Sequence, residues 1–306
     1  MGQSYQLMVV EQHGNFELYL IIMSDIDNNL REEFIDKGYV VLKSVFKKDY
    51  IAGLREKMTY LSSKNVYEFE LLFDKDIENI LLNQKLIDTI KKILATKSLL
   101  YFSESNIMHA YDPFKITSRY HKDSRDESKD IPYDNEYPII RVGIYFQNVK
   151  NFSGGLKIRE KSHKHFIFEN IFLDPLRLIK NLIITKYYNL NSLKLGKGIN
   201  LEIEEGDVVI WNLRTHHAGM SRRLKLFPKL CLWPSIEQLL PSFLFLPFQY
   251  DKHRLALFSS FAKNDLKNKN IMNYIIFKGA PFRISKINSN PDLLKKLNLM
   301  ECKLPY

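Results

Sequence analysis

The amino-acid sequence predicts a mainly β domain, a sandwich or a barrel, with helices on both sides of it in the chain. Short β-forming runs separated by turns follow one another from Leu99 to Trp233, a density typical of sandwiches and barrels. Amphipathic patterns precede this region, and helical patterning returns from Arg254 onward. With 306 residues, 45% of them hydrophobic, the chain can bury a sizeable core.

The chain before Leu99 is predicted to be mostly helical. Ser24 or Asp25 is a helix cap ahead of an apolar pattern, and Gly38 ends that helix. Apolar spacing then predicts a strand over 39–42 and helices over 47–61 and 77–94.

The β region is predicted to contain many short strands, six of which stand out. Gly154 and Gly155 supply the positive φ that a turn between two of them needs. An apolar insertion from Phe166 to Tyr188 is predicted to be a partly helical lid or rim. The predicted strands lie over 99–102, 137–149, 156–159, 201–203, 208–213 and 224–233.

Composition narrows the class of protein. The net charge of +10 and the pI near 9.3 allow contact with nucleic acid, but no binding motif accompanies them, so a solvated lysine surface is favoured. Cys231 and Cys302 are not spaced as a disulfide framework or a zinc site. The apolar run from Glu17 to Met23 is too short for a membrane span and lacks signal-peptide features. We therefore expect a cytoplasmic protein without a membrane partner.

His121 and Asp123 form a His-x-Asp pair. In an extended segment, residues i and i+2 point to the same face, so the two side chains can reach a single metal ion. The alternative is that both are solvated residues of a polar loop.

A second segment, residues 206–219 (GDVVIWNLRTHHAG), predicts a turn, an apolar strand and a histidine at its far end. Two histidines and one carboxylate are the ligand set of the facial triad of non-haem Fe(II) oxygenases, which leaves coordination positions open. Zinc with the same ligands is the alternative, although no HExxH helix accompanies them.

Four segments together resemble the phytanoyl-CoA dioxygenase family in order and spacing. They are GYVVLKSVFKKDYIAGLREKM, HKD, YFQNVKNFSGGLKIREKSHK and GDVVIWNLRTHHAG, within a resemblance that runs from about Phe34 to Tyr274. The resemblance implies a double-stranded β-helix, a cupin-like jelly roll. It also implies an iron enzyme that uses 2-oxoglutarate and O2 to hydroxylate a substrate, with release of succinate and CO2.

The resemblance places His121 and Asp123 on Fe(II) and makes the histidine before Ala-Gly, His217, the distal ligand. His216 is the alternative; strand alternation from Trp211 favours His217 if the strand stays regular. Relatives that halogenate carry a small residue in place of the aspartate, so Asp123 favours hydroxylation.

The distal carboxylate of 2-oxoglutarate needs a cation, and arginine offers a planar fork for both oxygens. In the resembling family this arginine follows the distal histidine at a distance that falls near Phe227 and Pro228 here, so the sequence departs from the pattern. Arg223 is the first choice and Lys225, on the same strand face, the second. The alternative for each is an ordinary surface cation.

Arg141, Gly143, Tyr145 and Gln147 share one face of a predicted strand, which faces the cavity in the resembling fold. Tyr145 is a candidate to hydrogen-bond the cosubstrate, and Arg141 and Gln147 are candidates to bind an acidic substrate. The alternative for Tyr145 is a core or rim position.

The expected organisation is a single dioxygenase domain over 24–290, with its jelly-roll core at about 98–236 and an insertion at about 166–198. Residues 1–23 are an N-terminal extension and residues 291–306 a peripheral tail. The basic surface favours a small anionic substrate. The alternative functions are a non-catalytic cupin-like ligand-binding protein and a nucleic-acid-modifying oxygenase.

Overall fold

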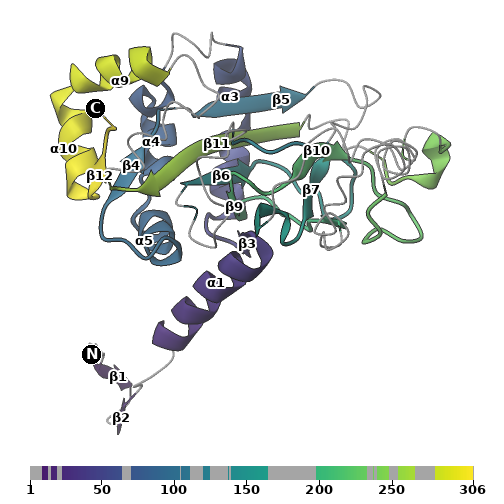
Figure 1. Cartoon of the computed structure of the whole chain (residues 1–306), viewed down its shortest axis with the longest axis horizontal. Coiled ribbons are helices and arrows are strands. Elements are labelled where there is room, and N and C mark those ends of the chain that lie inside the picture. The colour runs from purple at the N-terminus through teal and green to yellow at the C-terminus, as the bar shows by residue number, and fades with distance from the viewer. Residues whose placement is uncertain are drawn as a thin grey trace, which may run out of the picture.

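Helices α3, α4 and α5 lie along one side of the larger of two central β-sheets (Figure 1). The computed structural model describes residues 9–12, 15–18, 23–63, 70–103, 105–110, 120–124, 137, 139–164, 198–232, 237, 240–247, 254–265 and 280–305. The helices are α1 (Met23–Lys37), α2 (Lys48–Gly53), α3 (Arg55–Ser62), α4 (Lys75–Leu81), α5 (Gln84–Ile93), α9 (Ala280–Asn288) and α10 (Pro291–Leu299), with 3-10 turns η1 (Leu71–Phe73), η2 (Ser162–Lys164) and η5 (Ser242–Leu244). The strands are β1 (Val9–Gln12), β2 (Asn15–Leu18), β3 (Tyr39–Leu42), β4 (Leu99–Tyr101), β5 (Asn106–Ala110), β6 (Ile139–Tyr145), β7 (Gly155–Arg159), β8 (Gly198–Asn200), β9 (Val208–Asn212), β10 (His217–Ser221), β11 (Arg254–Lys263) and β12 (Cys302–Lys303).

Helix α1 passes directly into strand β3 through Gly38. Gly38 has a φ of +86°, and its N–H donates to the Phe34 carbonyl oxygen at 2.8 Å. The Gly38 carbonyl oxygen in turn accepts hydrogen bonds from the Asn212 N–H at 3.0 Å and the Thr215 hydroxyl at 2.8 Å. This glycine therefore joins the helix to the turn that precedes His217.

The predicted helices over 47–61 and 77–94 are each divided in two. The break between α2 and α3 follows Gly53, which has a low helix propensity. The break between α4 and α5 falls at Asn83, whose side chain accepts a hydrogen bond from the Leu86 N–H at 3.2 Å and caps α5. The apolar spacing continues across both breaks, so periodicity alone does not reveal them.

The larger sheet has the order β12-β4-β11-β6-β9-β3, and β5 also pairs with β11. Its pairs are antiparallel except β12 with β4, which is parallel. In this register Tyr145 lies opposite Ala256, and Arg141 lies between Ser260 and Trp211. Residues from β6, β9 and β11 therefore share one stretch of the same face.

The smaller sheet has the order β10-β7-β8 and is antiparallel. An isolated antiparallel bridge joins His121 to His217, the first residue of β10. The segment around His121 therefore extends this sheet beyond β10.

The two sheets pack face to face through buried side chains. Tyr145, Trp211 and Phe258 from the larger sheet belong to the same cluster as Leu156 and Ile158 from β7. These larger-sheet residues alternate with residues that point the other way, as a strand requires. The interior of the fold is the space between these two sheets.

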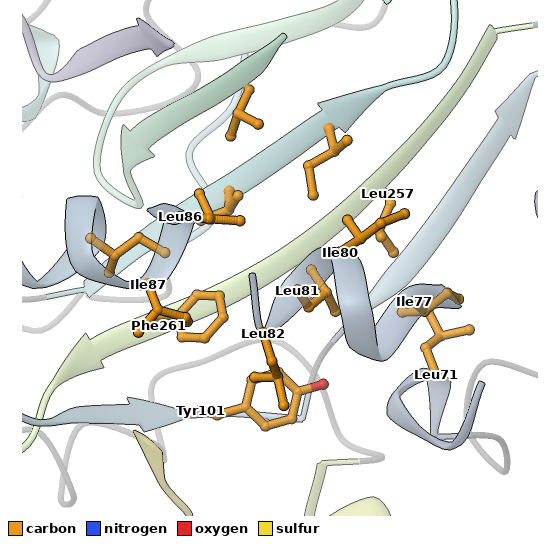
Figure 2. Close-up of a cluster of buried hydrophobic side chains, with 14 of the residues drawn as sticks. Leu71, Ile77, Ile80, Leu81, Leu82, Leu86, Ile87, Tyr101, Leu257 and Phe261 are labelled. Carbon is orange, nitrogen blue, oxygen red and sulfur yellow. The ribbon is translucent and has the colours of Figure 1, made fainter. Parts of the chain in front are cut away.

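Helices cover the opposite face of the larger sheet. Ile80, Leu86 and Ile87 from α4 and α5 pack in one buried cluster with Leu257 and Phe261 of β11 (Figure 2). This apolar layer holds the larger sheet rigidly, so that its other face can carry polar groups.

The prediction of helical structure from Arg254 onward is wrong for the first ten residues. Arg254–Lys263 is the strand β11, 10 residues long, which pairs with β4, β5 and β6. The run RLALFSSFAK is short and apolar, and periodicity does not separate a buried strand from a buried helix at this length. A core that ends near residue 236 therefore lacks a central strand.

The C-terminal segment 291–306, expected to be a peripheral tail, contributes to the main core. Leu293 and Leu297 of α10 and Cys302 of β12 are buried in the cluster beneath the larger sheet. Leu293 and Leu297 are four residues apart, so their side chains share the buried face of α10.

Two further predictions concern a strand over 224–233 and a lid from Phe166 to Tyr188. Residues 224–232 form no strand, only single bridges that join Leu224 to Phe245 and Leu230 to Ile199. The predicted lid from Phe166 to Tyr188 lies outside the described residues. Within the described part of the chain, no helix has the length and apolar character needed to cross a bilayer.

We expect Gly38→Ala to lower the free energy of unfolding by about 1–3 kcal/mol, the usual cost of a strained backbone position. A Cβ at this positive φ would lie 2.3 Å from Nδ1 of His163 and 2.8 Å from Oγ1 of Thr215. Urea denaturation measures the change. Gly53→Ala is the matched control, since a Cβ there meets nothing within 4 Å; equal effects of the two substitutions would contradict this role for Gly38.

Candidate metal centre

Backbone pairing brings His121 and His217 together. Each N–H donates to the other residue's carbonyl oxygen at 2.9 Å, the pattern of a hydrogen-bonded antiparallel pair. Their rings lie 4.4 Å apart between centroids. Asp123, two residues after His121, is held by a hydrogen bond from its N–H to the Leu213 carbonyl oxygen at 2.9 Å.

The three side chains converge on one point. Nε2 of His121 is 3.9 Å from Oδ1 of Asp123, and Nε2 of His217 is 3.6 Å from Oδ2 of Asp123. One ligand atom from each residue lies within 4.8 Å of the others. Donors bound at about 2.1 Å to one ion at right angles lie about 3 Å apart, so a small closure of this group would coordinate a metal. The structure thus places the three predicted ligands in a metal-binding arrangement.

The His217 ring is oriented for coordination through Nε2. Its Nδ1 lies 3.0 Å from the Thr215 carbonyl oxygen, which can only accept, so the proton resides on Nδ1. Burial lowers the pKa of His217 from 6.5 to about 4, although Asp123 opposes the shift. At neutral pH the ring is therefore uncharged, with its Nε2 lone pair directed at the centre.

Asp123 remains ionised although it is largely buried. Burial raises its pKa, but His217, Arg141 and His121 outweigh this and lower the pKa to about 2. Nε of Arg141 donates to Oδ2 at 3.2 Å, and Nη1 of Arg141 donates to the Ser260 hydroxyl at 2.9 Å. Arg141, predicted as a substrate ligand, is thus placed against the Asp123 carboxylate and orients it.

The neighbouring His216 is held on a different set of partners. Its N–H donates to the Ser162 hydroxyl and its carbonyl oxygen accepts from the Arg159 N–H, both at 2.9 Å. Burial and then the positive charge of Lys122 lower the pKa of its ring to about 3. His217 is the histidine that joins His121 and Asp123, as predicted, but the reasoning from a regular strand does not apply, because β9 ends at Asn212 and a turn intervenes.

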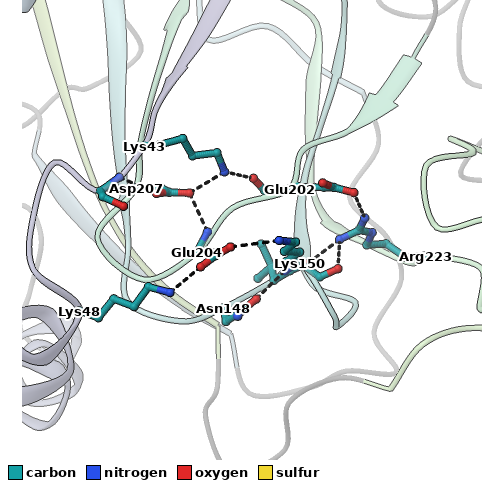
Figure 3. A network of polar contacts seen from close by, with 10 residues as sticks. Lys43, Lys48, Asn148, Lys150, Glu202, Glu204, Asp207 and Arg223 are labelled. Carbon is teal, nitrogen blue, oxygen red and sulfur yellow. Dashed lines mark hydrogen bonds and ion pairs between the residues drawn. The ribbon is translucent and has the colours of Figure 1, made fainter.

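Arg223, the first choice for the cosubstrate, is bound elsewhere (Figure 3). Nη1 donates to the carbonyl oxygens of Val149 and Lys150 at 2.7 and 2.6 Å, and Nε donates to that of Pro228 at 3.1 Å. Nη2 lies 3.5 Å from Oε1 of Glu202. The side chain is only 1% exposed, so this guanidinium anchors loops instead of facing the triad.

The other predicted polar residues, Lys225, Gln147 and Tyr145, have separate placements. Lys225 is exposed, and its N–H donates to the Leu244 carbonyl oxygen at 2.9 Å. Oε1 of Gln147 accepts a hydrogen bond from the Leu255 N–H at 2.8 Å, a structural contact at the end of β6. Tyr145 does point into the interior, as predicted.

A cation that the sequence analysis missed lies beside Tyr145. Arg254 begins β11, and a Cβ on Gly219 would lie 2.5 Å from its Nη1, so the guanidinium packs directly on this glycine. Gly219 lies two residues after His217 on β10. Arg254 therefore packs on the strand that begins with His217, and it begins the next strand of the chain, β11.

The Tyr145 and Arg254 side chains leave hydrogen-bonding capacity in the interior. Burial raises the pKa of Tyr145, and the nearby Arg254 guanidinium opposes the rise. The Arg254 guanidinium lies within hydrogen-bonding reach of the Tyr145 hydroxyl, and Nε of Arg254 has no hydrogen-bond partner among the described residues. Buried donors of this kind are expensive to leave unsatisfied, which indicates a place for an acceptor such as a carboxylate.

Comparison with known proteins finds likeness in structure alone. No family model and no curated sequence matches the chain. The non-heme alpha ketoglutarate dependent epimerase SnoN from nogalamycin biosynthesis aligns with a TM-score of 0.51 at 11% identity, over 78% of this chain and 84% of SnoN. The carbocyclase SnoK of the same biosynthesis aligns with a TM-score of 0.50 at 12% identity, over 78% of this chain and 84% of SnoK. At such identities the likeness shows a shared fold.

We expect His121→Ala and Asp123→Ala each to lower the affinity for Fe(II) or Mn(II) at least about tenfold, because each removes one of three ligands. Isothermal titration calorimetry under anaerobic conditions measures the affinity, and circular dichroism verifies the fold. His216→Gln is the control and should bind metal normally. Undiminished affinity in both ligand variants would exclude this triad as the metal site.

We also expect metal-free protein to lose stability as the pH falls from about 6.5 to about 5. His216 and His217 have lowered pKa values in the folded state, so the unfolded state binds more protons in this range and acid favours unfolding. Each proton contributes up to about 1.4 kcal/mol per pH unit. Urea midpoints measured in chelator test this, and His216→Gln should reduce the slope; a stability that does not change over this range would contradict burial of the neutral rings.

Proposed function

We propose that this chain is an Fe(II)- and 2-oxoglutarate-dependent oxygenase that hydroxylates a small organic substrate and releases succinate and CO2. One observation carries the proposal. Two imidazoles and one carboxylate converge beside an interior where Arg254, with Nε unpaired among the described residues, lies next to the Tyr145 hydroxyl. The two imidazoles and the carboxylate are the ligand set of non-haem Fe(II) oxygenases. The Arg254 and Tyr145 side chains suit the far carboxylate of 2-oxoglutarate.

The strand order supports a double-stranded β-helix, the jelly roll expected from the sequence. The chain crosses repeatedly from one sheet to the other. Strands β5, β6, β9 and β11 lie in the larger sheet, and the His121 segment, β7, β8 and β10 lie in the smaller one. The order in the larger sheet is β5-β11-β6-β9, and in the smaller it is His121-β10-β7-β8. We further infer a distant relationship to the phytanoyl-CoA dioxygenase family, which rests on the sequence landmarks of this chain.

His121, Asp123 and His217 would hold the iron, and their neighbours preserve the required forms. The Thr215 carbonyl oxygen keeps the His217 proton on Nδ1. Arg141 keeps Asp123 ionised and fixes Oδ2 by a hydrogen bond. Such contacts around the ligands commonly raise metal affinity by tenfold or more.

Arg254 and Tyr145 would bind the far carboxylate of 2-oxoglutarate. The Arg254 guanidinium has the planar fork that pairs with two carboxylate oxygens, and the Tyr145 hydroxyl can donate to one of them. Gly219 leaves room for the guanidinium, since any larger residue would displace it. We therefore transfer the cosubstrate role from Arg223 and Lys225 to Arg254, with Tyr145 retained.

Bound iron, 2-oxoglutarate and O2 would supply the oxidising chemistry that amino-acid side chains lack. The chain contributes positioning and exclusion of water. The Trp211 ring lies 5.3 Å from that of His217 and meets Phe258 edge to face at 5.8 Å, which gives the centre an apolar wall. His121, in contrast, has a side chain that is 47% exposed, so the centre can be approached from that side.

Asp123 supports hydroxylation over halogenation, because the carboxylate occupies the position that a halide would need. Another structure of SnoN, in complex with Fe3+, alpha ketoglutarate and nogalamycin RO, aligns with a TM-score of 0.51. That likeness supports a small-molecule substrate. A nucleic-acid substrate rests only on the charge of +10, and a ligand-binding protein without activity would leave the ionised Asp123 unexplained.

Succinate formation tests the proposal. Anaerobic protein loaded with Fe(II) and 2-oxoglutarate should form succinate slowly after O2 is admitted, and His121→Ala should abolish it. Arg254→Met should raise the KM for 2-oxoglutarate about tenfold to a hundredfold, the effect of losing hydrogen bonds to a charged group, with metal affinity unchanged. Lys225→Ala should leave KM unchanged, and Arg223→Met should lower stability. Equal succinate formation by wild type and His121→Ala would refute the oxygenase, and an unchanged KM in Arg254→Met would refute the cosubstrate site.

A further inference from the structure

The segment 222–246, which follows β10, exposes four large apolar side chains that we call the apolar tip. Leu226 is 83% exposed, Phe227 63%, Leu230 44% and Phe243 69%. Figure 1 shows this segment in green at the edge of the molecule remote from α9 and α10. Soluble proteins seldom gather exposed apolar residues in one place unless a partner covers them.

The base of this segment is firmly anchored, so the exposure is built into the fold. Arg223 is buried against three backbone carbonyl groups, and its carbonyl oxygen accepts from the Leu246 N–H at 2.7 Å. Lys157 and Glu237 form an ion pair at 2.8 Å with both side chains fully buried. Polar groups are thus buried at the base while apolar groups face outward at the tip, the reverse of the usual arrangement.

Local pairing brings the tip residues together. Leu224 and Phe245 form an antiparallel bridge, and the Lys225 N–H donates to the Leu244 carbonyl oxygen at 2.9 Å. The next residues outward are Leu226 and Phe243, one from each side of this pair. A turn closed by a hydrogen bond from the Leu230 N–H to the Phe227 carbonyl oxygen at 2.9 Å holds the other two. Backbone pairing therefore links Leu226 to the side of Phe243, and Phe227 to Leu230, while all four side chains stay exposed.

The exposed charges within 222–246 have one sign. Lys225 and Lys229 are exposed beside the apolar tip, and Arg222 stacks on the Phe245 ring at 3.9 Å. Glu237 is the single acidic residue in 222–246, and it is buried against Lys157. An apolar surface with a basic rim complements a bilayer with anionic headgroups.

We propose that the apolar tip inserts into the interface of an anionic lipid bilayer, with Lys225 and Lys229 at the headgroups, which replaces the expectation from the sequence that the protein has no membrane partner. This mode of binding needs no membrane-spanning helix, so it is compatible with the absence of one among the described helices. A second copy of this chain fits less well, because two tips would bring their lysines together in a protein of net charge +10. The inference is independent of the proposed oxygenase activity.

Vesicle sedimentation with the full chain tests this surface. The protein should sediment with phosphatidylcholine vesicles that contain phosphatidylglycerol, and much less with phosphatidylcholine alone. The double substitution L226S/F227S should lower the partition coefficient at least about tenfold, because two apolar side chains no longer leave water. K225E/K229E should lower binding to the anionic vesicles and weaken its dependence on salt.

The controls lie on α10, where Leu299 is 73% exposed and Lys295 is also exposed. L299S and K295E should leave binding unchanged, which separates the apolar tip from general surface charge. Equal losses in the control variants, or no binding to anionic vesicles at low salt, would overturn the proposal. A concentration-dependent dimer in light scattering that L226S/F227S dissociates, without vesicle binding, would also overturn it and assign the surface to self-association.

Discussion

The antiparallel pairing of His121 with His217 is the contact on which the rest of the site depends. Two backbone hydrogen bonds of 2.9 Å fix these residues opposite each other. In such a pair the side chains leave the sheet on the same face. Asp123 follows at the spacing that returns to this face. One backbone register thus places two imidazoles and a carboxylate together, although they come from distant parts of the chain.

The ion pair between Arg141 and Asp123 connects the two sheets across the interior. Asp123 follows the segment that extends the smaller sheet, whereas Arg141 and its partner Ser260 belong to the larger one. The carboxylate is therefore held from both sides. The apolar layer beneath the larger sheet makes this possible, because helices and strands packed there keep β6 and β11 rigid while their other face carries polar side chains.

Arg223 and Arg254 show how similar residues acquire different roles. Both follow His217, and the sequence favoured Arg223 because a short loop after His217 would bring it near the position of the family's arginine. The backbone bends after β10 and buries Arg223 against loop carbonyl groups. Arg254 arrives beside Gly219 because β11 re-enters the larger sheet next to β6. Proximity in sequence was therefore a poor guide, since the chain between the two arginines leaves the sheets and returns.

Local chemistry accounts for what the sequence predicted well. The strands over 39–42, 99–102 and 208–213 and the helical character of 47–61 and 77–94 follow from apolar periodicity and turn residues. These features depend on neighbours within a few residues, which the sequence displays directly. The His-x-Asp spacing, together with the family resemblance that made the histidine before Ala-Gly the distal ligand, pointed to three side chains that the structure brings together.

Only the tertiary structure decided which polar groups share the interior. Arg141 contacts Asp123, and the Gln147 side chain accepts a hydrogen bond from the backbone of β11. Arg254, and not Arg223, lies beside Tyr145. Each contact depends on strand pairing between distant segments. It also decided that Leu226 and Phe227 remain exposed, although their apolar character suggests a buried strand. The physical reason is that sheet register and loop paths depend on the free energy of packing the whole chain, and no local pattern contains that information.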